Sequence, residues 1–189
     1  MPIIKIPFEE RHLITPNEVD QMIKTAPELK DKAIIALYYI FGVRRNEPLS
    51  IIKEDIWIDD KWFYIKIKRE KMKKGSVLPR IDTLKVTKDT KFLSYIIELW
   101  SGLNDGDFLF SYHPNPATAS LKIYHMIRKI NPKIWIHLFR HTRNDYFRRK
   151  GYTREQRMAW FGWSDPRTPD KSYSHPAEKD IEEMGSKIE

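Results

Sequence analysis

The chain has 189 residues, of which 41% are hydrophobic and 32% are charged, so it is long and apolar enough for one folded domain, which excludes a disordered tail. A net charge of +8 favours a polyanionic partner, either nucleic acid or an acidic membrane surface. The absence of cysteine excludes disulfides, thiolate metal sites and cysteine nucleophiles. Because the sequence has no run like a membrane span and no signal-like start, we expect a soluble, cytoplasmic protein with no segment in a membrane.

The first part of the chain is predicted to be helical after a lead-in segment over residues 1–14. Thr15, Pro16 and Glu18 form the pattern of a helix start, with Thr15 as N-cap and Glu18 reaching back to it. A second helix is expected from about Leu29 to Phe41, ending at Gly42. A third, short helix begins near Glu47.

A small antiparallel sheet is predicted next. Partial alternation of apolar and polar residues from Ile56 to Ile67, around Asp59 and Asp60, indicates a strand, a turn and a second strand. Residues 70–75 are expected to form a charged turn, and residues 76–81 a third strand.

Helices are expected again after the sheet. Their ranges are Thr87 to about Trp100, Pro116 to about Ile130, His137 to Lys150, and a short helix capped by Thr153 and Gln156 that ends at Gly162. Ile181, Met184 and Ile188 mark a weak terminal helix. The predicted fold is therefore mainly α with a small antiparallel β-sheet, an α+β domain over residues 15–176 followed by a tail over residues 177–189.

The composition carries a hint about habitat. Ile occurs 24 times, whereas Asn and Gln together occur 8 times. Few amides, no cysteine and abundant Lys, Glu and Ile are typical of a thermophile protein. AT-rich codon usage also enriches Lys and Ile, and the composition favours neither interpretation over the other.

Positive charge gathers in two zones of the sequence. Residues 61–80 carry a net charge of +7 and residues 122–157 a net charge of +9, whereas residues 174–189 carry −3. Two separated basic zones suggest a clamp around a phosphate backbone. Lysine-rich hairpins also serve as ordinary solubility devices, so either zone alone would decide little.

Several residues could act on a phosphodiester. Arg44 follows the expected helix end, and its guanidinium could bind two phosphate oxygens at once. The carboxylate of Glu47, three residues later, could fix the Arg44 rotamer. His137 and Arg140 share one helix face. His137 and His141 have a metal-compatible spacing, but no Glu follows the first His and no third ligand is evident nearby, so we expect no metal there.

These residues stand in an order that resembles the tyrosine recombinase (integrase) family. The segments that carry the resemblance are Gly42 to Leu49, a Lys-bearing hairpin, His137 to Thr142, Phe161 to Ser164 and Lys171 to His175. They span the chain from the Thr15 helix to His175. The resemblance implies the catalytic domain of a site-specific DNA recombinase or integrase, a helical fold with a small sheet.

The resemblance also implies roles for individual residues. It makes Tyr173 the nucleophile of a covalent 3′-phosphotyrosine intermediate, and Lys71, eight residues before Pro79, the hairpin lysine, with Lys73 and Lys74 as alternatives. The full implied catalytic set is Arg44, Lys71, His137, Arg140, Trp163 and Tyr173. The expected DNA-binding set is Lys66, Lys68, Arg69, Lys73, Lys74 and Arg143.

Partners are implied by the same resemblance. It implies double-stranded DNA, a homo-oligomer on DNA (a tetramer), a tail helix that docks on a neighbouring protomer, and no metal, ATP or other cofactor. Because only a dozen residues precede the expected domain, the chain is either an excised domain or a minimal member of the family. Two other functions stay open: a DNA-relaxing activity like that of type IB topoisomerases, and DNA binding without cleavage.

Overall fold

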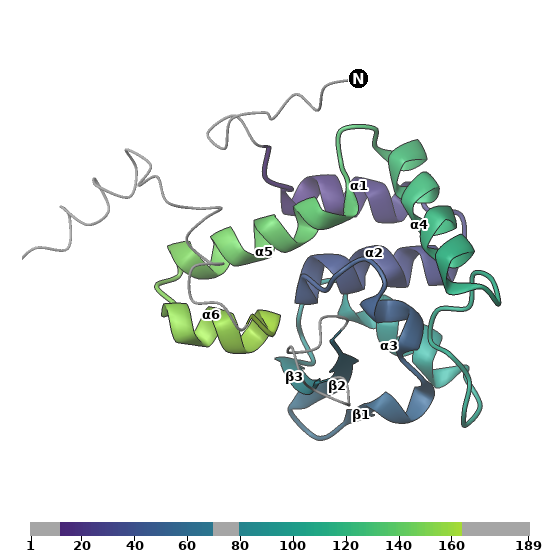
Figure 1. Ribbon diagram of the computed structural model, residues 1–189, viewed down its shortest axis with the longest axis horizontal. Coiled ribbons are helices and arrows are strands. Elements are labelled where there is room, and N and C mark those ends of the chain that lie inside the picture. The colour runs from purple at the N-terminus through teal and green to yellow at the C-terminus, as the bar shows by residue number, and fades with distance from the viewer. Residues whose placement is uncertain (1–11, 70–79, 164–189) are drawn as a thin grey trace, which may run out of the picture.

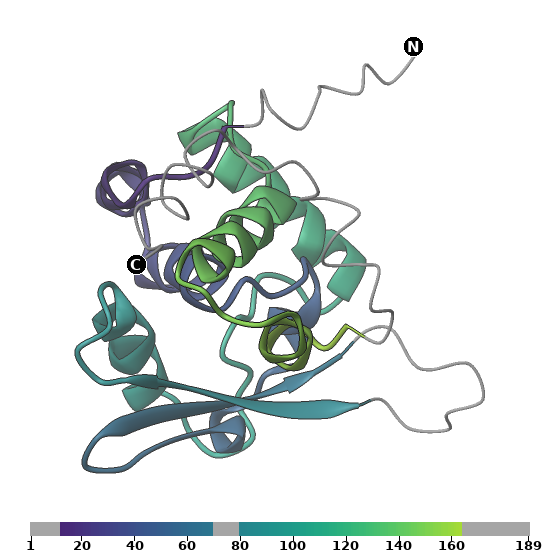
Figure 2. The ribbon, with the colours of Figure 1, turned by 90° about the vertical axis from the view of Figure 1, so that its left-hand side faces the viewer.

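The computed structural model describes residues 12–69 and 80–163 (Figure 1). Within these ranges, the chain forms α-helices, two short 3-10 helices and a three-stranded sheet that lies along one edge of the molecule (Figure 2). The elements are α1 (Pro16–Thr25), α2 (Leu29–Phe41), η2 (Glu47–Ser50), η3 (Lys53–Asp55), β1 (Ile56–Ile58), β2 (Trp62–Lys68), β3 (Ile81–Thr87), α3 (Leu93–Ser101), α4 (Pro116–Ile130), α5 (Ile136–Arg149) and α6 (Arg154–Phe161). The expected turn at residues 70–75, Tyr173 and the tail at residues 177–189 lie outside the described residues.

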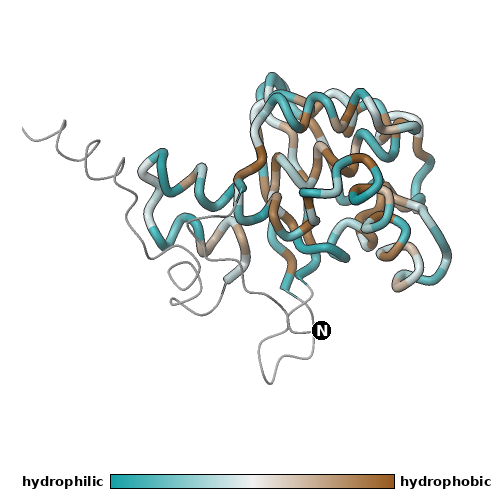
Figure 3. Tube along the Cα trace, turned by 90° about the horizontal axis from the view of Figure 1, so that it is seen from above, coloured by the Kyte–Doolittle hydropathy of each residue, from teal (hydrophilic) through white to brown (hydrophobic). Residues whose placement is uncertain are grey.

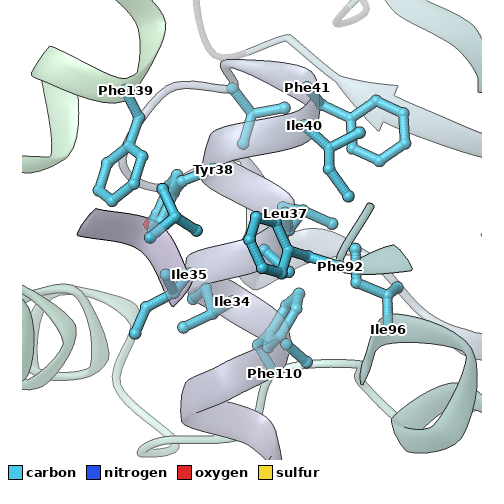
Figure 4. Close-up of a cluster of buried hydrophobic side chains, with 14 of the residues drawn as sticks. Ile34, Ile35, Leu37, Tyr38, Ile40, Phe41, Phe92, Ile96, Phe110 and Phe139 are labelled. Carbon is cyan, nitrogen blue, oxygen red and sulfur yellow. The ribbon is translucent and has the colours of Figure 1, made fainter. Parts of the chain in front are cut away.

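Helix α2 is the centre of the hydrophobic core. Its residues Ile34, Ile35 and Leu37 are fully buried, and Figure 4 shows core side chains on several sides of this helix. Helices α1, α3 and α5 all pack against it. A helix that is apolar nearly all round needs neighbours all round, which explains why α2 takes the middle of the fold (Figure 1).

Most of the predicted helix boundaries are confirmed. Thr15 and Glu18 form the expected capping box of α1, and α2 ends at Gly42 in the left-handed conformation. Thr153 and Gln156 cap α6 in the same way. The short helix at Glu47 is a 3-10 helix.

The sheet confirms the hairpin around Asp59, and its third strand ends later than expected. β1 pairs antiparallel with β2, and β2 with β3. β3 covers residues 81–87, in register with all of β2, so the strand continues past Ile81, where the expected third strand ended; residues 76–79 of that expectation lie outside the described residues. The helix expected from Thr87 therefore begins only at Leu93. Residues 81–87 extend the sheet because their alternation lets Leu84 face the core.

Helices α5 and α6 form the more polar end of the molecule. Figure 2 shows α6, seen end-on, lying between α5 and the sheet. In Figure 3 the hydrophobic colour concentrates in the central helices, while the projecting α5–α6 end is mostly hydrophilic. Of the helices within the described residues, none is both long enough and apolar enough to span a bilayer.

Candidate active site

The C-terminal end of α2 is capped by side chains from α5 and α6. The last carbonyl groups of a helix have no partner inside the helix and must find one elsewhere. Arg143 donates to the Tyr39 carbonyl from Nε at 2.9 Å, and the indole of Trp160 donates to the Phe41 carbonyl at 3.0 Å. These bonds tie together three helices at the point where the chain turns toward Arg44.

Gly42 is required at this junction by both backbone and space. Its φ is +61°, a conformation that side chains with a Cβ rarely adopt. A Cβ on Gly42 would lie 2.8 Å from Cε1 of Phe161 and 3.1 Å from Cβ of Arg143. The glycine therefore allows α5 and α6 to approach the end of α2 closely.

Arg44 is fixed by Glu47. The carboxylate accepts one hydrogen bond from Nη1 of Arg44 at 2.9 Å and a second from the Arg44 backbone N–H at 2.7 Å. The Glu47 side chain is fully buried, whereas the Arg44 side chain keeps 17% of its surface exposed. The paired carboxylate expected from the spacing thus holds a guanidinium that still reaches solvent.

Arg140 lies at the same junction and is buried. It donates from Nη1 to the Gly42 carbonyl at 2.9 Å and from Nη2 to the Phe161 carbonyl at 2.7 Å. Its guanidinium carbon lies 5.2 Å from the centre of the Trp163 ring, and that ring packs on Phe161. Arg44, Arg140 and Trp163 are therefore brought together around Gly42 and the end of α6.

His137 begins the face of α5 that carries Arg140. Its side chain is exposed, and its ring meets the His141 ring edge to face with a centroid distance of 4.7 Å. Among the described residues, no group of three or more His, Cys, Asp or Glu side chains is arranged to hold a metal ion. His137 and Arg140 thus lie three residues apart on α5, on the same helix face, and the part expected of His137 in catalysis stays a prediction.

Two residues expected to bind DNA form hydrogen bonds to other parts of the protein. Arg69 is 2% exposed and its Nε donates to Asp82 at 2.7 Å, so its guanidinium belongs to the protein interior. Arg143 makes two hydrogen bonds to the Tyr39 carbonyl, and burial lowers the pKa of its guanidinium. The structure therefore shows protein partners for both guanidinium groups, and DNA binding by either residue stays a prediction.

Lys66 and Lys68 occupy the places expected of surface contacts. They lie on the outer face of β2, where residues alternate with the buried Ile65 and Ile67. Lys68 is 39% exposed, with its ammonium 3.8 Å from Asp55. It also lines a groove of about 760 Å³, together with Arg45, Asn46, Glu47, Leu49, Ser50, Arg69, Pro116, Ala117, Ser120 and Leu121.

The remaining expected residues fall on segments that are not described. Lys71, Lys73 and Lys74 lie within residues 70–79, and Tyr173 lies within residues 164–189. The described part nevertheless fixes where these segments begin. Arg69 and Arg80, at the two ends of the hairpin segment, are joined by a backbone hydrogen bond of 2.8 Å.

Sequence reasoning missed three residues that contribute to this region. Asp82 and the carbonyl of Trp160 both bind Arg69, yet neither stands in a recognisable pattern with it. Arg45 was also passed over, although it follows Arg44 directly and lines the groove. Only the doubled arginine in the sequence could have signalled it.

The sequence matches a known protein family over most of its length. The model of the phage integrase family matches residues 12–180. No curated protein matches the sequence.

Solved structures share the fold. XerA recombinase superposes with a TM-score of 0.67 at 21% identity, covering 98% of this chain and 66% of its own. XerH site-specific recombinase bound to difH substrate superposes with a TM-score of 0.64 at 16% identity, and the match covers 100% of this chain and 56% of the XerH chain. The Tn1549 transposon integrase in complex with a circular intermediate DNA superposes with a TM-score of 0.69 at 13% identity, and the match covers 98% of this chain and 67% of the integrase chain. The chain thus spans between about half and two thirds of these proteins.

Proposed function

The chain belongs to the phage integrase family, and from that premise we propose that it is the catalytic domain of a tyrosine-type site-specific DNA recombinase that cleaves and rejoins DNA. The observation that carries the proposal is the junction at Gly42. Arg140 binds the Gly42 carbonyl, and Glu47 holds Arg44 two residues further along. Two arginines held by protein groups near Gly42 are suited to a phosphodiester whose charge grows during attack.

The proposed reaction is a phosphoryl transfer to Tyr173. The phenol oxygen attacks phosphorus, the bond from phosphorus to the 5′ oxygen breaks, and a 3′-phosphotyrosine forms. His137 assists removal of the phenol proton, and Lys71 gives a proton to the leaving 5′ oxygen, with Lys73 and Lys74 as the alternatives. Because one ester replaces another, bond energy is retained for rejoining, and neither ATP nor another cofactor enters the proposed reaction.

Arg44 and Arg140 then stabilise the negative charge of the transition state. Fixed donors aimed at developing charge contribute roughly 3 kcal/mol each. Trp163, packed against Arg140, keeps that guanidinium in place and closes one side of the site.

DNA is the proposed partner. Both XerH and the Tn1549 integrase were solved with DNA, and the net charge of +8 here suits the same ligand. Lys66 and Lys68 are proposed to contact the phosphate backbone, with Lys73 and Lys74 on the hairpin segment.

The covalent intermediate is the direct test. Supercoiled plasmid is incubated with protein at low salt, quenched with detergent and digested with or without protease. Wild-type protein should give nicked DNA that carries protein, and Tyr173→Phe should give none. Tyr152→Phe, which alters an exposed tyrosine, is the matched control and should behave as wild type.

Other outcomes would replace the proposal. Relaxed plasmid without recombinant product would indicate an activity like that of type IB topoisomerases. Binding with no adduct from any variant would indicate a DNA-binding protein that does not cleave. An adduct that survives Tyr173→Phe would assign the nucleophile to another tyrosine.

We also propose that protomers assemble on DNA as a tetramer and that residues 177–189 pack on a neighbouring protomer. The segment at residues 174–189 carries a net charge of −3 in a chain of +8, and Ile181, Met184 and Ile188 offer one apolar stripe. So short a helix is marginal alone. Deleting residues 180–189 should remove higher-order complexes on native gels and alter cleavage. Unchanged complexes and unchanged cleavage would contradict this arrangement.

A further inference from the structure

Arg69 connects three parts of the protein at the edge of the proposed active site. Its Nη1 donates to Glu47 at 3.3 Å, its Nε to Asp82 at 2.7 Å and its Nη2 to the Trp160 carbonyl at 2.6 Å. The partners belong to η2, β3 and α6 respectively. One guanidinium thus fixes the relative positions of a 3-10 helix, a strand and a helix.

The same carboxylate holds Arg44. Glu47 Oε2 accepts from Nη1 of Arg69 and also from the Arg44 backbone N–H, and Glu47 Oε1 accepts from Nη1 of Arg44. The side chains of Glu47 and Arg69 are 0% and 2% exposed. A buried carboxylate needs its full set of donors, so losing one changes how it holds the other.

The other contacts of Arg69 reach the segments on either side of it. Its backbone N–H bonds to the Arg80 carbonyl at 2.8 Å and closes the base of the β2–β3 hairpin. The end of α6 packs directly on its side chain: a Cβ on Gly162 would lie 2.7 Å from Nε of Arg69 and 2.9 Å from a carboxylate oxygen of Asp82. Gly162 precedes Trp163, whose ring packs over Arg140.

We propose that Arg69 is a positioning residue of the cleavage site, setting Arg44 through Glu47 while fixing the hairpin base and the end of α6 relative to it. Arg69 does not touch DNA, because its guanidinium is buried and bonded to protein. The inference rests on the proposed function and adds a residue to which neither the sequence pattern nor the family match gives a catalytic role. A network that only stabilised the fold would not need to include the carboxylate that holds Arg44.

The first experiment separates cleavage from binding. Arg69→Met keeps the length of the side chain and removes its donors. At saturating protein, the rate of covalent adduct formation on plasmid should fall by about tenfold to hundredfold, the cost expected when a reacting group is misplaced, while the dissociation constant for DNA stays within about twofold. Ile23→Val and Ile23→Ala alter a buried residue on α1. The Ile23 variant whose decrease in Tm is the same as that of Arg69→Met serves as the control for stability.

The second experiment asks whether Arg69 acts through Arg44. Arg69→Met is added to Arg44→Lys, and adduct rates are compared for wild type, both single variants and the double variant. If Arg69 positions Arg44, the double variant should be slowed little more than Arg44→Lys alone. Independent, multiplied losses would overturn the inference, as would a cleavage rate for Arg69→Met equal to that of the stability-matched Ile23 variant.

A conservative variant covers the case in which Arg69→Met does not fold. Arg69→Lys keeps the charge but cannot donate in the planar fork that three separate acceptors require. It should retain the fold by circular dichroism and still lose about tenfold in cleavage rate at saturating protein. If the wild-type protein cleaves DNA and Arg69→Lys is fully active, only the positioning role of Arg69 is overturned. If the wild-type protein forms no adduct, the proposed function is overturned.

Discussion

Nη1 of Arg140 lies 2.9 Å from the carbonyl oxygen of Gly42, although the two residues are 98 positions apart in the chain. The bond places a guanidinium from α5 directly beside the loop that carries Arg44. It also gives a partner to a carbonyl at the end of α2, where a cation interacts favourably with the helix dipole. Arg140 therefore contributes to the stability of the fold and to the geometry of the site through the same side chain.

Gly42→Ala should destabilise the protein and slow cleavage. A Cβ there meets Phe161 at 2.8 Å in a left-handed conformation, so strain and overlap add to about 3 kcal/mol or more. Gly106→Ala is the matched control, because its φ is +83° and nothing lies within 4 Å of the added Cβ; it should lose about 1–2 kcal/mol from strain alone. Urea unfolding of both variants measures the difference, and equal losses would contradict the close packing.

Arg44→Ala and Arg140→Ala should each slow adduct formation by about 100-fold or more at saturating DNA, with a much smaller loss of affinity. Arg140→Ala should also lower Tm more than Arg44→Ala does, because Arg140 is buried and donates hydrogen bonds to two backbone carbonyls. Lys24→Ala, an exposed change on α1, controls for loss of one positive charge. Proportional losses of binding and cleavage would make the arginines simple DNA contacts.

Affinity for duplex DNA should fall steeply with salt. Each phosphate neutralised contributes a slope of about −0.9 to the plot of log affinity against log salt concentration. Lys68→Ala should make that slope shallower by about one, and Lys24→Ala should leave it unchanged. Fluorescence anisotropy with a labelled duplex measures both, and a flat wild-type response would argue against DNA as the partner.

The partly buried Tyr112 makes stability depend on alkaline pH. Its phenol donates to Asp31 at 2.6 Å, and burial, followed by this carboxylate, raises the pKa of Tyr112 well above the ordinary value of 10. Above about pH 10 the unfolded chain loses this proton while the folded protein keeps it, so the free energy of unfolding should fall with pH by up to about 1.4 kcal/mol per unit. Below pH 10 Tyr112 is protonated in both states and does not change the dependence of the free energy of unfolding on pH.

Tyr112→Phe should be less stable than wild type at neutral pH and should lack this part of the alkaline slope. Denaturant unfolding between pH 8 and about pH 11 measures the difference between the two proteins, in which the other tyrosines cancel. Identical slopes would show that the Tyr112 phenol ionises equally in both states.

Local patterns determined much of the secondary structure. The Thr15 and Thr153 capping boxes and the glycine stops at Gly42 and Gly162 work over three or four residues, so they are readable before folding. The end of the third strand was expected at Ile81 and lies at Thr87, because residues 81–87 show their strand character only when Leu84 pairs with Ile65 across the sheet. Pairing between distant segments leaves a weak local signal.

The sequence by itself determined the fold class, the order of the motifs and the identity of the arginine and histidine candidates, since these depend on residue type and spacing along the chain. Only the tertiary structure decided which basic side chains turn inward. Nothing in the sequence separates Arg69 and Arg143 from the basic residues of the surface, yet both donate to acceptors from distant parts of the chain. The reason is that a buried guanidinium is stable only where acceptors surround it, and Glu47, Asp82 and the α2 carbonyls reach those positions only when distant segments of the chain pack together.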